Sequence, residues 1–301
     1  MTVAALALAL VHATLAASTA SQPLPSVTVA PARVRPGDAF LVVVRGPTSP
    51  PAASVAGHAL AFYQVPEGFA AVAGLPVETP SGRLAIPVAL PPGASAEAGA
   101  RTVEGAVEVT APGFAHRELE VPRSFVAPPP PEVQRRIEED RAAFARAFSQ
   151  PPAPPLFAAG FARPRRARVT AGFGEHRTMN GVKPSQHYGM DLAGKVGAPV
   201  TAANTGKVVL VRDCWASGLT VVLWHGANLY TTYFHLSRAS VGPGAHVARG
   251  QLIGLVGKSG RASGPHLHWG TKVGALYVDP ASVLRLPLEK RAKHESHDAK
   301  P

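Results

Sequence analysis

Short apolar runs broken by glycine and proline fill the first third of the chain. Within each run, β-branched and aromatic residues alternate with polar residues or follow one another. The candidate strands cover residues 26–29, 39–44, 84–88, 103–110 and 117–121. Short strands at this spacing, separated by turns, are typical of a β-sandwich. The pattern therefore predicts an immunoglobulin-like β-sandwich over residues 26–127, in which no side chain has a catalytic pattern.

One segment has the period of a helix instead. Pro131 suits the first helical position, and Glu132 suits the first turn. Apolar side chains then recur near one face, and most charged side chains lie elsewhere. These apolar positions are Val133, Ile137, Phe144 and Phe148. We expect a helix over residues 131–149 within a proline-rich linker that spans residues 128–160.

The second half, residues 161–288, returns to short strands and glycine turns. Residues 219–224 are strongly β-forming, and a turn at residues 225–228 leads into a second run over residues 229–236. Further strands are expected as a pair within residues 200–211, in a meander over residues 244–260, and over residues 264–272. These elements predict a compact antiparallel β domain with an open groove, so the fold class of the whole chain is all-β.

Two histidine-bearing stretches in this half carry the candidate chemistry. Alternate side chains of an extended strand share a face, so His187 and Asp191 point one way if residues 186–192 form one strand. By the same rule His266 and His268 share a face. Two imidazoles and a carboxylate brought together could bind zinc and leave a fourth position for water, as catalytic zinc sites do.

Several motifs in this half follow one another in a familiar order. They are Gly-Phe-Gly at 172–174, His-Tyr-Gly-Met-Asp at 187–191, Tyr-Phe-His-Leu-Ser at 233–237, Gly-Gln-Leu-Ile-Gly at 250–254, Gly-Lys-Ser-Gly at 257–260, Gly-Pro-His-Leu-His-Trp at 264–269 and Val-Asp-Pro at 278–280. With these motifs, residues 170–280 resemble the lysostaphin/LytM-type zinc metallopeptidases, the cell-wall endopeptidases of bacteria. The resemblance covers a little over a third of the chain.

The resemblance implies a role for each histidine of these motifs. His187, Asp191 and His268 would be the ligands of a Zn²⁺ cofactor. His235 and His266 would be the catalytic histidines, one as general base for water and the other as donor to the developing oxyanion. The sequence leaves open which of the two has which role.

Two further positions are candidate substrate contacts. Tyr233 shares a face with His235 in a regular strand, although a core tyrosine fits the pattern equally well. Asn180 lies where members of the resembled family often carry an asparagine near the groove. One departure concerns the residues after Gly174, where His176 stands in the place of an expected arginine and Arg177 follows. This shift puts a peripheral substrate contact in doubt and leaves the metal ligands unaffected.

Length and charge narrow the class of protein. A chain of 301 residues favours two domains over one. Its 31 prolines and 29 glycines disfavour long helices. Its net charge of +11 is compatible with polyanionic partners, among them the acidic polymers of a bacterial envelope, although a generic solubilising surface accounts for such a charge as well. No nucleic-acid-binding motif accompanies the charge, so we expect no nucleic-acid partner. Cys214 is the only cysteine, which excludes an intramolecular disulfide and suggests an inert buried thiol.

The two ends of the chain have different compositions. Residues 3–17 are apolar and alanine-rich, about the length of a signal-peptide core and short for a membrane span, although no basic residue precedes them. We interpret residues 1–20 as a signal peptide, which predicts a periplasmic or secreted protein of the cell envelope without stable membrane insertion. Residues 289–301 are polar and charged, which predicts a disordered tail.

Together these features predict a zinc endopeptidase that hydrolyses the peptide cross-links of peptidoglycan. An alternative is a non-enzymatic LytM-type regulator that activates another wall hydrolase. A third is an envelope-binding protein that acts through its sandwich. The sandwich itself could act as a spacer, occlude the active site or dock a regulatory protein. If it occludes the site, a shorter chain that begins near Phe161 should be more active.

Overall fold

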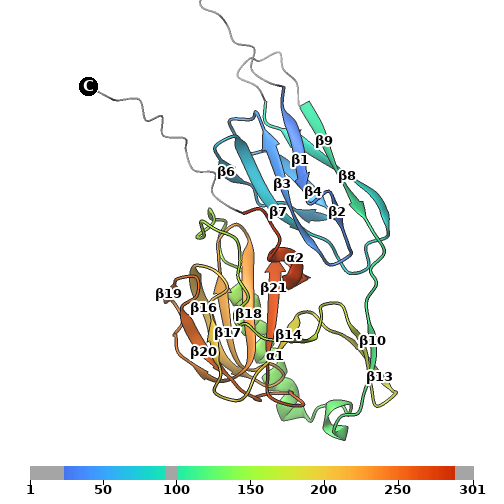
Figure 1. Cartoon of the computed structure of the whole chain (residues 1–301), viewed down its shortest axis with the longest axis vertical. Coiled ribbons are helices and arrows are strands. Elements are labelled where there is room, and N and C mark those ends of the chain that lie inside the picture. The colour runs from blue at the N-terminus through green and yellow to red at the C-terminus, as the bar shows by residue number, and fades with distance from the viewer. Residues whose placement is uncertain (1–23, 93–100, 289–301) are drawn as a thin grey trace, which may run out of the picture.

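The computed structural model describes residues 24–92 and 101–288, in two bodies that lie one above the other (Figure 1). The upper body holds the N-terminal strands, and the lower body holds the second half of the chain. The expected signal peptide and the expected C-terminal tail lie outside the described residues. The fold is nearly all β, as the sequence predicts. No helix within the described ranges has the length and apolar character that a membrane crossing requires.

The N-terminal strands form two sheets. The inner sheet, which faces the lower body, has the order β1 (Ser26–Ala30), β3 (Ala39–Arg45), β7 (Gly68–Gly74) and β6 (Tyr63–Val65). The outer sheet has the order β2 (Arg33–Val34), β9 (Arg101–Val109), β8 (Gly82–Leu90), β4 (Ala52–Val55) and β5 (His58–Ala59). Between them lies an apolar core that includes Phe40, Val42, Ile86 and Val88. This arrangement agrees with the expected sandwich, whereas its immunoglobulin-like topology stays a prediction.

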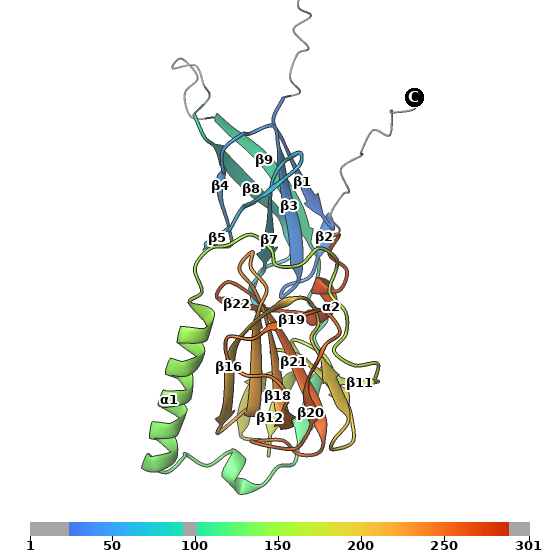
Figure 2. The ribbon, with the colours of Figure 1, turned by 90° about the vertical axis from the view of Figure 1, so that its left-hand side faces the viewer.

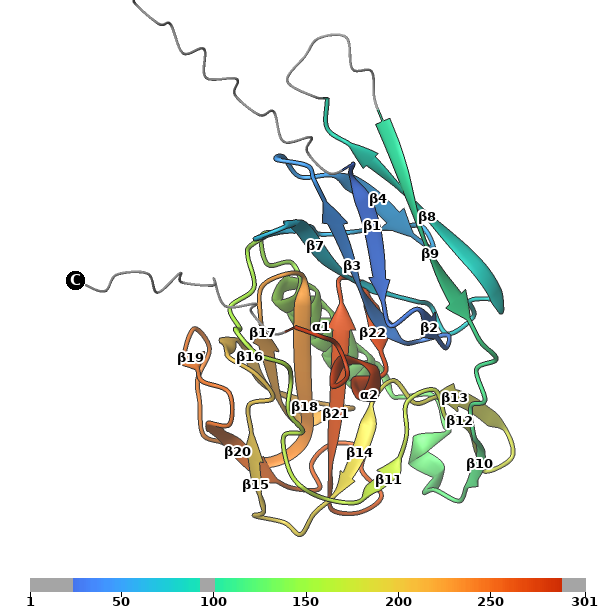
Figure 3. The same cartoon turned by 45° about the horizontal axis from the view of Figure 1, so that its top comes forward.

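Strand β3 is buried on both of its faces. Phe40 and Val42 point into the sandwich core, while Leu41 joins Val72 of β7 in the core of the lower body. This double burial explains why residues 39–44 read as a continuous apolar run rather than an alternating one. Figure 3 shows the inner sheet resting on the lower body. The inner sheet therefore contributes side chains to the cores of both bodies, so the bodies are joined by apolar packing as well as by the connecting chain.

The strand expected over residues 117–121 forms, but it does not belong to the sandwich. It appears as β10 (His116–Leu119) and pairs in parallel with β12 (His176–Met179) of the second half. A third strand, β13 (Lys183–Gln186), completes this small sheet, and the short helix η1 (Arg123–Phe125) follows β10. The chain thus crosses from the sandwich to the lower body before the proline-rich segment begins.

The predicted helix is confirmed as α1 (Pro131–Phe148). It stands along the outside of the lower body (Figure 2). Phe144 and Phe148 contact the rings of Phe234 and Tyr230, with centroids 6.0 and 5.3 Å apart. The buried stripe also contains a charged residue, Asp140, whose carboxylate lies 2.6 Å from the Arg212 guanidinium. Further ion pairs join Arg136 to Asp213 and Glu139 to Arg212, so the helix is anchored by aromatic contacts and by ion pairs to β16 (Gly206–Cys214).

The lower body is built on one antiparallel sheet. Its main path runs β11 (Val169–Ala171), β14 (Met190–Ala193), β21 (His266–Val273), β18 (Leu229–Ala239), β17 (Gly218–Trp224), β16 (Gly206–Cys214) and β19 (His246–Val247). Off this path, β15 (Pro199–Thr201) pairs with β20 (Leu252–Val256), and β22 (Leu276–Val278) pairs with β21. The short helix α2 (Pro280–Val283) follows β22.

The β17–β18 hairpin and the strand that carries His266 and His268 are confirmed. The expected strand pair within residues 200–211 is wrong, because β15 and β16 pair with β20 and β17 instead of with each other. Cys214 at the end of β16 is buried, in agreement with an inert thiol. Burial raises the pKa of this thiol, with a smaller opposing effect from its contact with Ser217.

Candidate functional site

His187 and Asp191 approach each other through a turn. The stretch from residue 186 to residue 192 is not one strand, because β13 ends at Gln186 and β14 begins at Met190. The expectation that strand alternation aligns these two side chains is therefore wrong. Gly189 lies in the break, and a Cβ atom there would stand 2.5 Å from Nε2 of His268. The glycine keeps the turn close enough for His187 to reach the neighbouring strand.

The pairing of β14 with β21 supplies the other two side chains. Asp191 lies directly opposite His268 in this antiparallel register, and Ala193 lies opposite His266. Directly opposed residues of paired strands point to the same side of the sheet. Asp191 and His268 are thus adjacent because of backbone pairing, and His187 is added from the turn that precedes β14.

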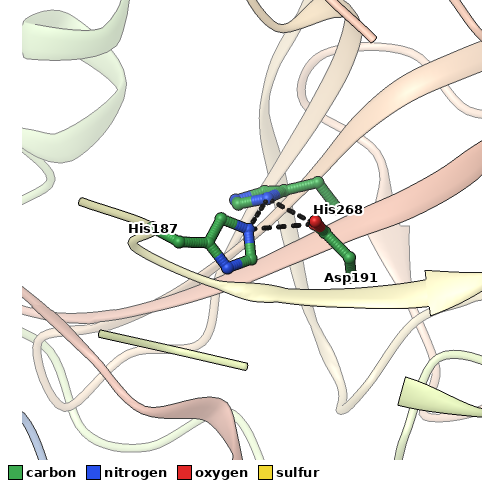
Figure 4. A group of neighbouring side chains, drawn as sticks. All are labelled: His187, Asp191 and His268. Carbon is green, nitrogen blue, oxygen red and sulfur yellow. Dashed lines mark hydrogen bonds and ion pairs between the residues drawn. The ribbon is translucent and has the colours of Figure 1, made fainter. Parts of the chain in front are cut away.

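The three side chains converge on one point (Figure 4). Nε2 of His187 lies 3.0 Å from Oδ1 of Asp191 and 2.9 Å from Nδ1 of His268. Nδ1 of His268 lies 2.9 Å from the same carboxylate oxygen. His187 and Asp191 are buried, and His268 is partly buried. We call this group the His-Asp-His cluster.

Hydrogen bonding outside the cluster sets the tautomer of His187. Its Nδ1 lies 2.7 Å from the carbonyl oxygen of Gly172, which can only accept a hydrogen bond, so Nδ1 carries the proton. Nε2 therefore presents a lone pair to Oδ1 of Asp191, itself an acceptor. Two acceptors 3.0 Å apart repel each other unless a shared donor or a cation lies beside them, and Nδ1 of His268 lies 2.9 Å from both. The donor set of two imidazoles and a carboxylate fits a divalent metal ion such as zinc.

The second oxygen of Asp191 is held by a chain of ion pairs. Arg177 donates to Oδ2 of Asp191 at 3.2 Å and to Glu175 at 2.7 Å. Glu175 also pairs with Arg117 of β10 at 3.1 Å. Because Oδ2 of Asp191 is bound by Arg177, Oδ1 remains available to the cluster. The ion pairs connect Asp191, through Arg177 and Glu175, to Arg117 in the segment that precedes α1. Sequence reasoning placed Arg177 only at the periphery.

Charge and burial oppose each other at Asp191. Burial acts to raise the pKa of its carboxyl group, but the neighbouring imidazoles, among them the His268 ring that donates from Nδ1, outweigh this effect and hold the pKa well below its usual range. Burial also lowers the pKa of His268, while the bond to Asp191 opposes that change. Both directions favour a carboxylate and a neutral imidazole, which are the forms that bind a metal ion.

A β-bulge turns His235 toward the cluster. Between β17 and β18 the register shifts, so that Leu236 pairs with Leu219 while Tyr233 pairs with Val221, and β18 has one extra residue there. His235 lies at this extra position and adopts a φ of 61°. Such a φ costs on the order of 1–3 kcal/mol for a residue other than glycine. Bulges next to active sites redirect side chains in this way.

The bulge also explains why the expected role of Tyr233 is wrong. In a regular strand Tyr233 and His235 would share a face, but here Tyr233 points into the core and is 0% exposed. Its hydroxyl accepts a hydrogen bond from the backbone nitrogen of Ala203 at 2.9 Å. Phe234 of this strand faces the cluster together with His235, and its ring stacks on His268 with centroids 5.0 Å apart.

His235 and His266 present equivalent nitrogens to the cluster. Nδ1 of His235 lies 2.9 Å from the carbonyl oxygen of Ser259, and Nδ1 of His266 lies 2.8 Å from that of Gly264. Because carbonyl oxygens only accept, each Nδ1 is the donor and each Nε2 has a free lone pair. The two rings are 4.8 Å apart, and Nε2 of His266 lies 3.7 Å from Oδ1 of Asp191.

The surroundings keep His235 neutral. Burial is the largest cause that lowers the pKa of His235, to about 4, and the nearby rings of His266 and His268 add to the effect. A neutral imidazole with a free Nε2 can accept a proton at neutral pH.

Asn180 is placed away from the cluster. It lies beyond the end of β12 with a φ of 51°, and its side-chain amide bonds both backbone groups of Val121, at 2.8 and 2.9 Å. Asn180 is not among the residues that line the cleft, so the expected substrate contact is not supported. Its side chain instead fastens the segment after β10 to the β12–β13 hairpin.

An open cleft of about 650 Å³ lies over the cluster. Its floor is the sheet face that carries Asp191, His268 and Phe234, and His235 and His266 line it as well. One wall comes from residues 116–125, which we call the crossing segment because they pass from the sandwich to α1. Leu119, Val121 and Phe125 of this segment line the cleft. The expected open groove is therefore present and is narrowed by a part of the chain outside the resembled region.

An all-β domain with a His-Asp-His cluster and two further imidazoles in an open cleft has the features of a metal-dependent hydrolase. Comparison of the sequence agrees, because residues 185–280 match the profile of Peptidase family M23. The chain therefore carries an M23 metallopeptidase domain of the LytM type, which confirms the resemblance seen in the motifs.

Curated relatives match over about two fifths of the chain. Peptidoglycan DD-endopeptidase ShyA of Vibrio cholerae is 36% identical over 132 residues, which are 42% of this chain and 31% of the relative. Peptidoglycan DD-endopeptidase ShyB of the same organism is 39% identical over 126 residues, or 41% of this chain and 29% of the relative. The chain spans about a third of the length of these relatives.

A solved structure is similar over a longer range. The crystal structure of a "putative peptidase M23" from Pseudomonas aeruginosa superimposes with a TM-score of 0.62 at 27% identity. The match covers 83% of this chain and 93% of that one, so it includes N-terminal strands as well as the M23 domain. The arrangement of sandwich and domain is therefore shared with a solved protein.

Proposed function

We propose that the protein is a zinc-dependent endopeptidase that hydrolyses peptide cross-links of peptidoglycan. The observation that carries the proposal is the His-Asp-His cluster in an open cleft, with the free Nε2 atoms of His235 and His266 beside it. The names of the curated relatives support peptidoglycan as the substrate. Zinc is favoured by the donor set, since a site with two imidazoles and one carboxylate leaves a coordination position open.

The roles of the side chains follow from their hydrogen bonds. His187, Asp191 and His268 would hold the metal ion, with Gly172 and Arg177 orienting the first two. A bound Zn²⁺ supplies a Lewis acid that polarises the scissile carbonyl and lowers the pKa of water to about 7. His235 and His266 would each hold or move a proton at Nε2, one as general base and one as donor to the oxyanion. Which histidine has which role stays open.

The cellular setting is part of the proposal. Because peptidoglycan lies outside the cytoplasm, the proposed substrate agrees with the expected signal peptide and with a periplasmic or secreted location. The proposed units are a sandwich over residues 26–127, a linker over residues 128–160 and a peptidase domain over residues 161–288, with the crossing segment packed on the last of these.

The crossing segment supports the hypothesis that the N-terminal part occludes the site, because it forms one wall of the cleft. Removing residues 1–160 would test occlusion only if the remainder folds, since Leu41 and Val72 belong to the lower core. Equal activity of a folded shorter chain and the full chain would contradict occlusion. A docking role for a regulatory protein stays a separate hypothesis.

The test of the main proposal is digestion of purified, cross-linked peptidoglycan by the protein with zinc, with products identified by mass spectrometry. We expect cross-linked dimers to disappear with wild-type protein and to persist with His187→Ala and His268→Ala. A matched control is His246→Ala, an exposed histidine on β19 outside the cleft, which should cleave normally. Zinc-loaded protein that leaves every cross-link intact would contradict the proposal and would favour the non-enzymatic regulator.

A further inference from the structure

The cleft is lined by more positively charged than negatively charged side chains, and not all of the positive ones are paired. Four arginines line it, namely Arg117, Arg168, Arg177 and Arg261, against the two carboxylates of Glu175 and Asp191. Both carboxylates are buried, and each is already paired with arginine. No acidic side chain among the cleft-lining residues is therefore left for a further cation.

Three of the four arginines have partners within the protein. Arg117 and Arg177 bind Glu175, and Arg177 also binds Asp191. Arg261 donates to the backbone oxygen of Phe125, and its guanidinium lies over the rings of Phe125 and Trp215 at 4.4 and 4.5 Å. These three arginines hold the walls of the cleft together.

Arg168 differs from the other three. It is exposed, and within residues 24–92 and 101–288 no hydrogen bond or ion pair of its side chain is formed. An exposed arginine without a partner is ordinary on a protein surface. In a cleft whose lining carboxylates are both paired with arginine, however, Arg168 is the side chain best placed to bind an anionic group of a ligand.

The backbone places Arg168 two strands away from His266, one of the two proposed catalytic histidines. Its carbonyl oxygen accepts a hydrogen bond from the nitrogen of Ala193 at 3.0 Å, and Ala193 lies opposite His266 in the β14–β21 register. Neighbouring strands are about 4.8 Å apart, so about 10 Å separates the backbone of Arg168 from that of His266. The methyl group of Ala193 leaves the space between the two side chains open.

This spacing fits a peptide that lies across the floor. An extended peptide spans about 3.3 Å per residue, so a group bound by Arg168 lies within about three residues of the bond held at the His-Asp-His cluster. A guanidinium binds a carboxylate through two parallel hydrogen bonds, a geometry that a carboxamide cannot match with equal strength. Peptide cross-links that retain free carboxylates offer such a group.

We propose that Arg168 is a specificity-determining residue that binds a free carboxylate of the peptide substrate near the scissile bond. The proposal rests on the proposed endopeptidase function and specifies which peptides the site prefers. It predicts that the protein discriminates between peptides with free and amidated carboxyl groups.

The test uses two probes: a cross-linked muropeptide dimer with free carboxylates, and the same dimer with its carboxylates converted to carboxamides. In the full-length protein we expect KM for the free dimer to be about 10-fold or more lower, as charge-assisted hydrogen bonds imply. Arg168→Gln should remove most of this preference by raising KM for the free dimer. Arg166→Gln, an exposed arginine two residues earlier that does not line the cleft, should keep it.

A binding measurement separates this inference from the proposed function. Affinities of both labelled dimers are measured by fluorescence anisotropy in the His235→Ala background, which lacks the proposed proton carrier but retains the three metal ligands. A preference for the free dimer that Arg168→Gln abolishes supports the inference even if the wild-type protein cleaves nothing. Equal affinity for the two dimers, or a preference that survives Arg168→Gln, would overturn it.

Salt adds a second discriminating readout. The affinity for the free dimer should fall between 0.05 and about 0.5 M salt, because an exposed ion pair is screened over a Debye length that shortens to a few ångströms. The affinity for the amidated dimer should change little. The same salt dependence for both dimers would contradict a carboxylate contact at Arg168.

Discussion

The two bodies of the molecule differ in the kinds of side chain that they bury. Within the described residues, the sandwich core between the inner and outer sheets contains only apolar side chains, among them Phe40, Ile86 and Val107. The lower body buries numerous polar groups beside its apolar core. They include His187, Asp191, His225, His235, Thr231, Thr232, Thr271 and Lys272. Among the described residues of the sandwich, Asp38 is the one buried polar or charged side chain, whereas the lower body must find partners for many.

His225 shows how the lower body meets this requirement away from the cleft. The ring is 0% exposed, Nδ1 donates to the carbonyl oxygen of Thr205 at 2.8 Å, and Nε2 lies 2.8 Å from the hydroxyl of Thr231. That hydroxyl lies 3.0 Å from the hydroxyl of Tyr233. Buried polar groups that are fully bonded, as at His225, make the core specific. His235 differs because its Nε2 has no hydrogen-bond partner among the described residues and faces the cleft, so polarity in the core indicates function here only where the free atom is also reachable from the cleft.

The largest expected effect comes from the charge of the His-Asp-His cluster. Asp191→Asn keeps the shape of the side chain but removes the anion, so zinc affinity should fall by more than about 100-fold and cleavage should be lost. Changes to groups that only orient a ligand already cost about 10–100-fold. Zinc affinity is measured by competition with a chromogenic chelator. The sandwich should remain folded by circular dichroism, and unchanged zinc affinity would refute the assignment.

The next largest effect is expected at the two proposed catalytic histidines, and it should differ from the effect of changing a proposed metal ligand. His235→Ala and His266→Ala should each lower kcat by about 10²–10⁴-fold while zinc stays bound, because each removes a proton carrier and leaves the metal ligands in place. The control is Tyr233→Phe, which removes a core hydroxyl and should destabilise the protein without changing KM. A raised KM in Tyr233→Phe would restore the substrate contact that the structure contradicts.

A change in the sandwich core should affect stability alone. Phe40→Ala removes a fully buried ring and should lower the free energy of unfolding by about 3–5 kcal/mol. Urea unfolding followed by fluorescence gives this value, and zinc affinity of the folded variant should be unchanged. Weaker zinc binding in that folded variant would show that the two bodies do not act independently.

His225, a buried histidine of the lower body outside the cleft, should make stability depend on pH. Burial lowers the pKa of His225 to about 4, while an unfolded chain has a value near 6.5. Because the unfolded state binds more protons between these values, the stability contributed by neutral His225 is complete above pH 6.5 and is lost as pH falls to 4. The expected loss between pH 7 and pH 5 is about 2 kcal/mol.

His225→Gln removes this titration, so its stability should change less with pH over the same range than that of the wild-type protein. Urea unfolding at pH 7 and pH 5 compares the two proteins. Parallel pH profiles would mean that His225 titrates normally in the folded state.

The smallest effect is expected where the two bodies meet. The guanidinium of Arg35 lies 2.9 Å from Asp279, but its side chain is 44% exposed. Solvent weakens such a pair, so Arg35→Ala should cost about 1 kcal/mol or less by thermal or urea unfolding. A much larger loss would indicate that this ion pair, rather than the shared apolar sheet, holds the bodies together.

The sequence by itself determined the elements whose signals are local. Turn residues and β-branched runs predicted most strands, Pro131 and the apolar period predicted α1, and the ordered motifs predicted the M23 domain. The cluster of His187, Asp191 and His268 could also be named in advance, because it depends on residue types within those motifs. Residue types and local turn and strand patterns carry these signals, although the adjacency of Asp191 and His268 itself comes from the pairing of β14 with β21.

Tertiary structure alone decided how the neighbouring side chains are used. The bulge that turns His235 toward the cleft and Tyr233 into the core is a register shift between β17 and β18, which neither strand encodes alone. The pairing of β10 with β12, and the ion pairs from Arg117 through Arg177 to Asp191, join residues up to 74 positions apart. Such contacts depend on which strands pair and in what register, and that choice is made by the packing of the whole chain.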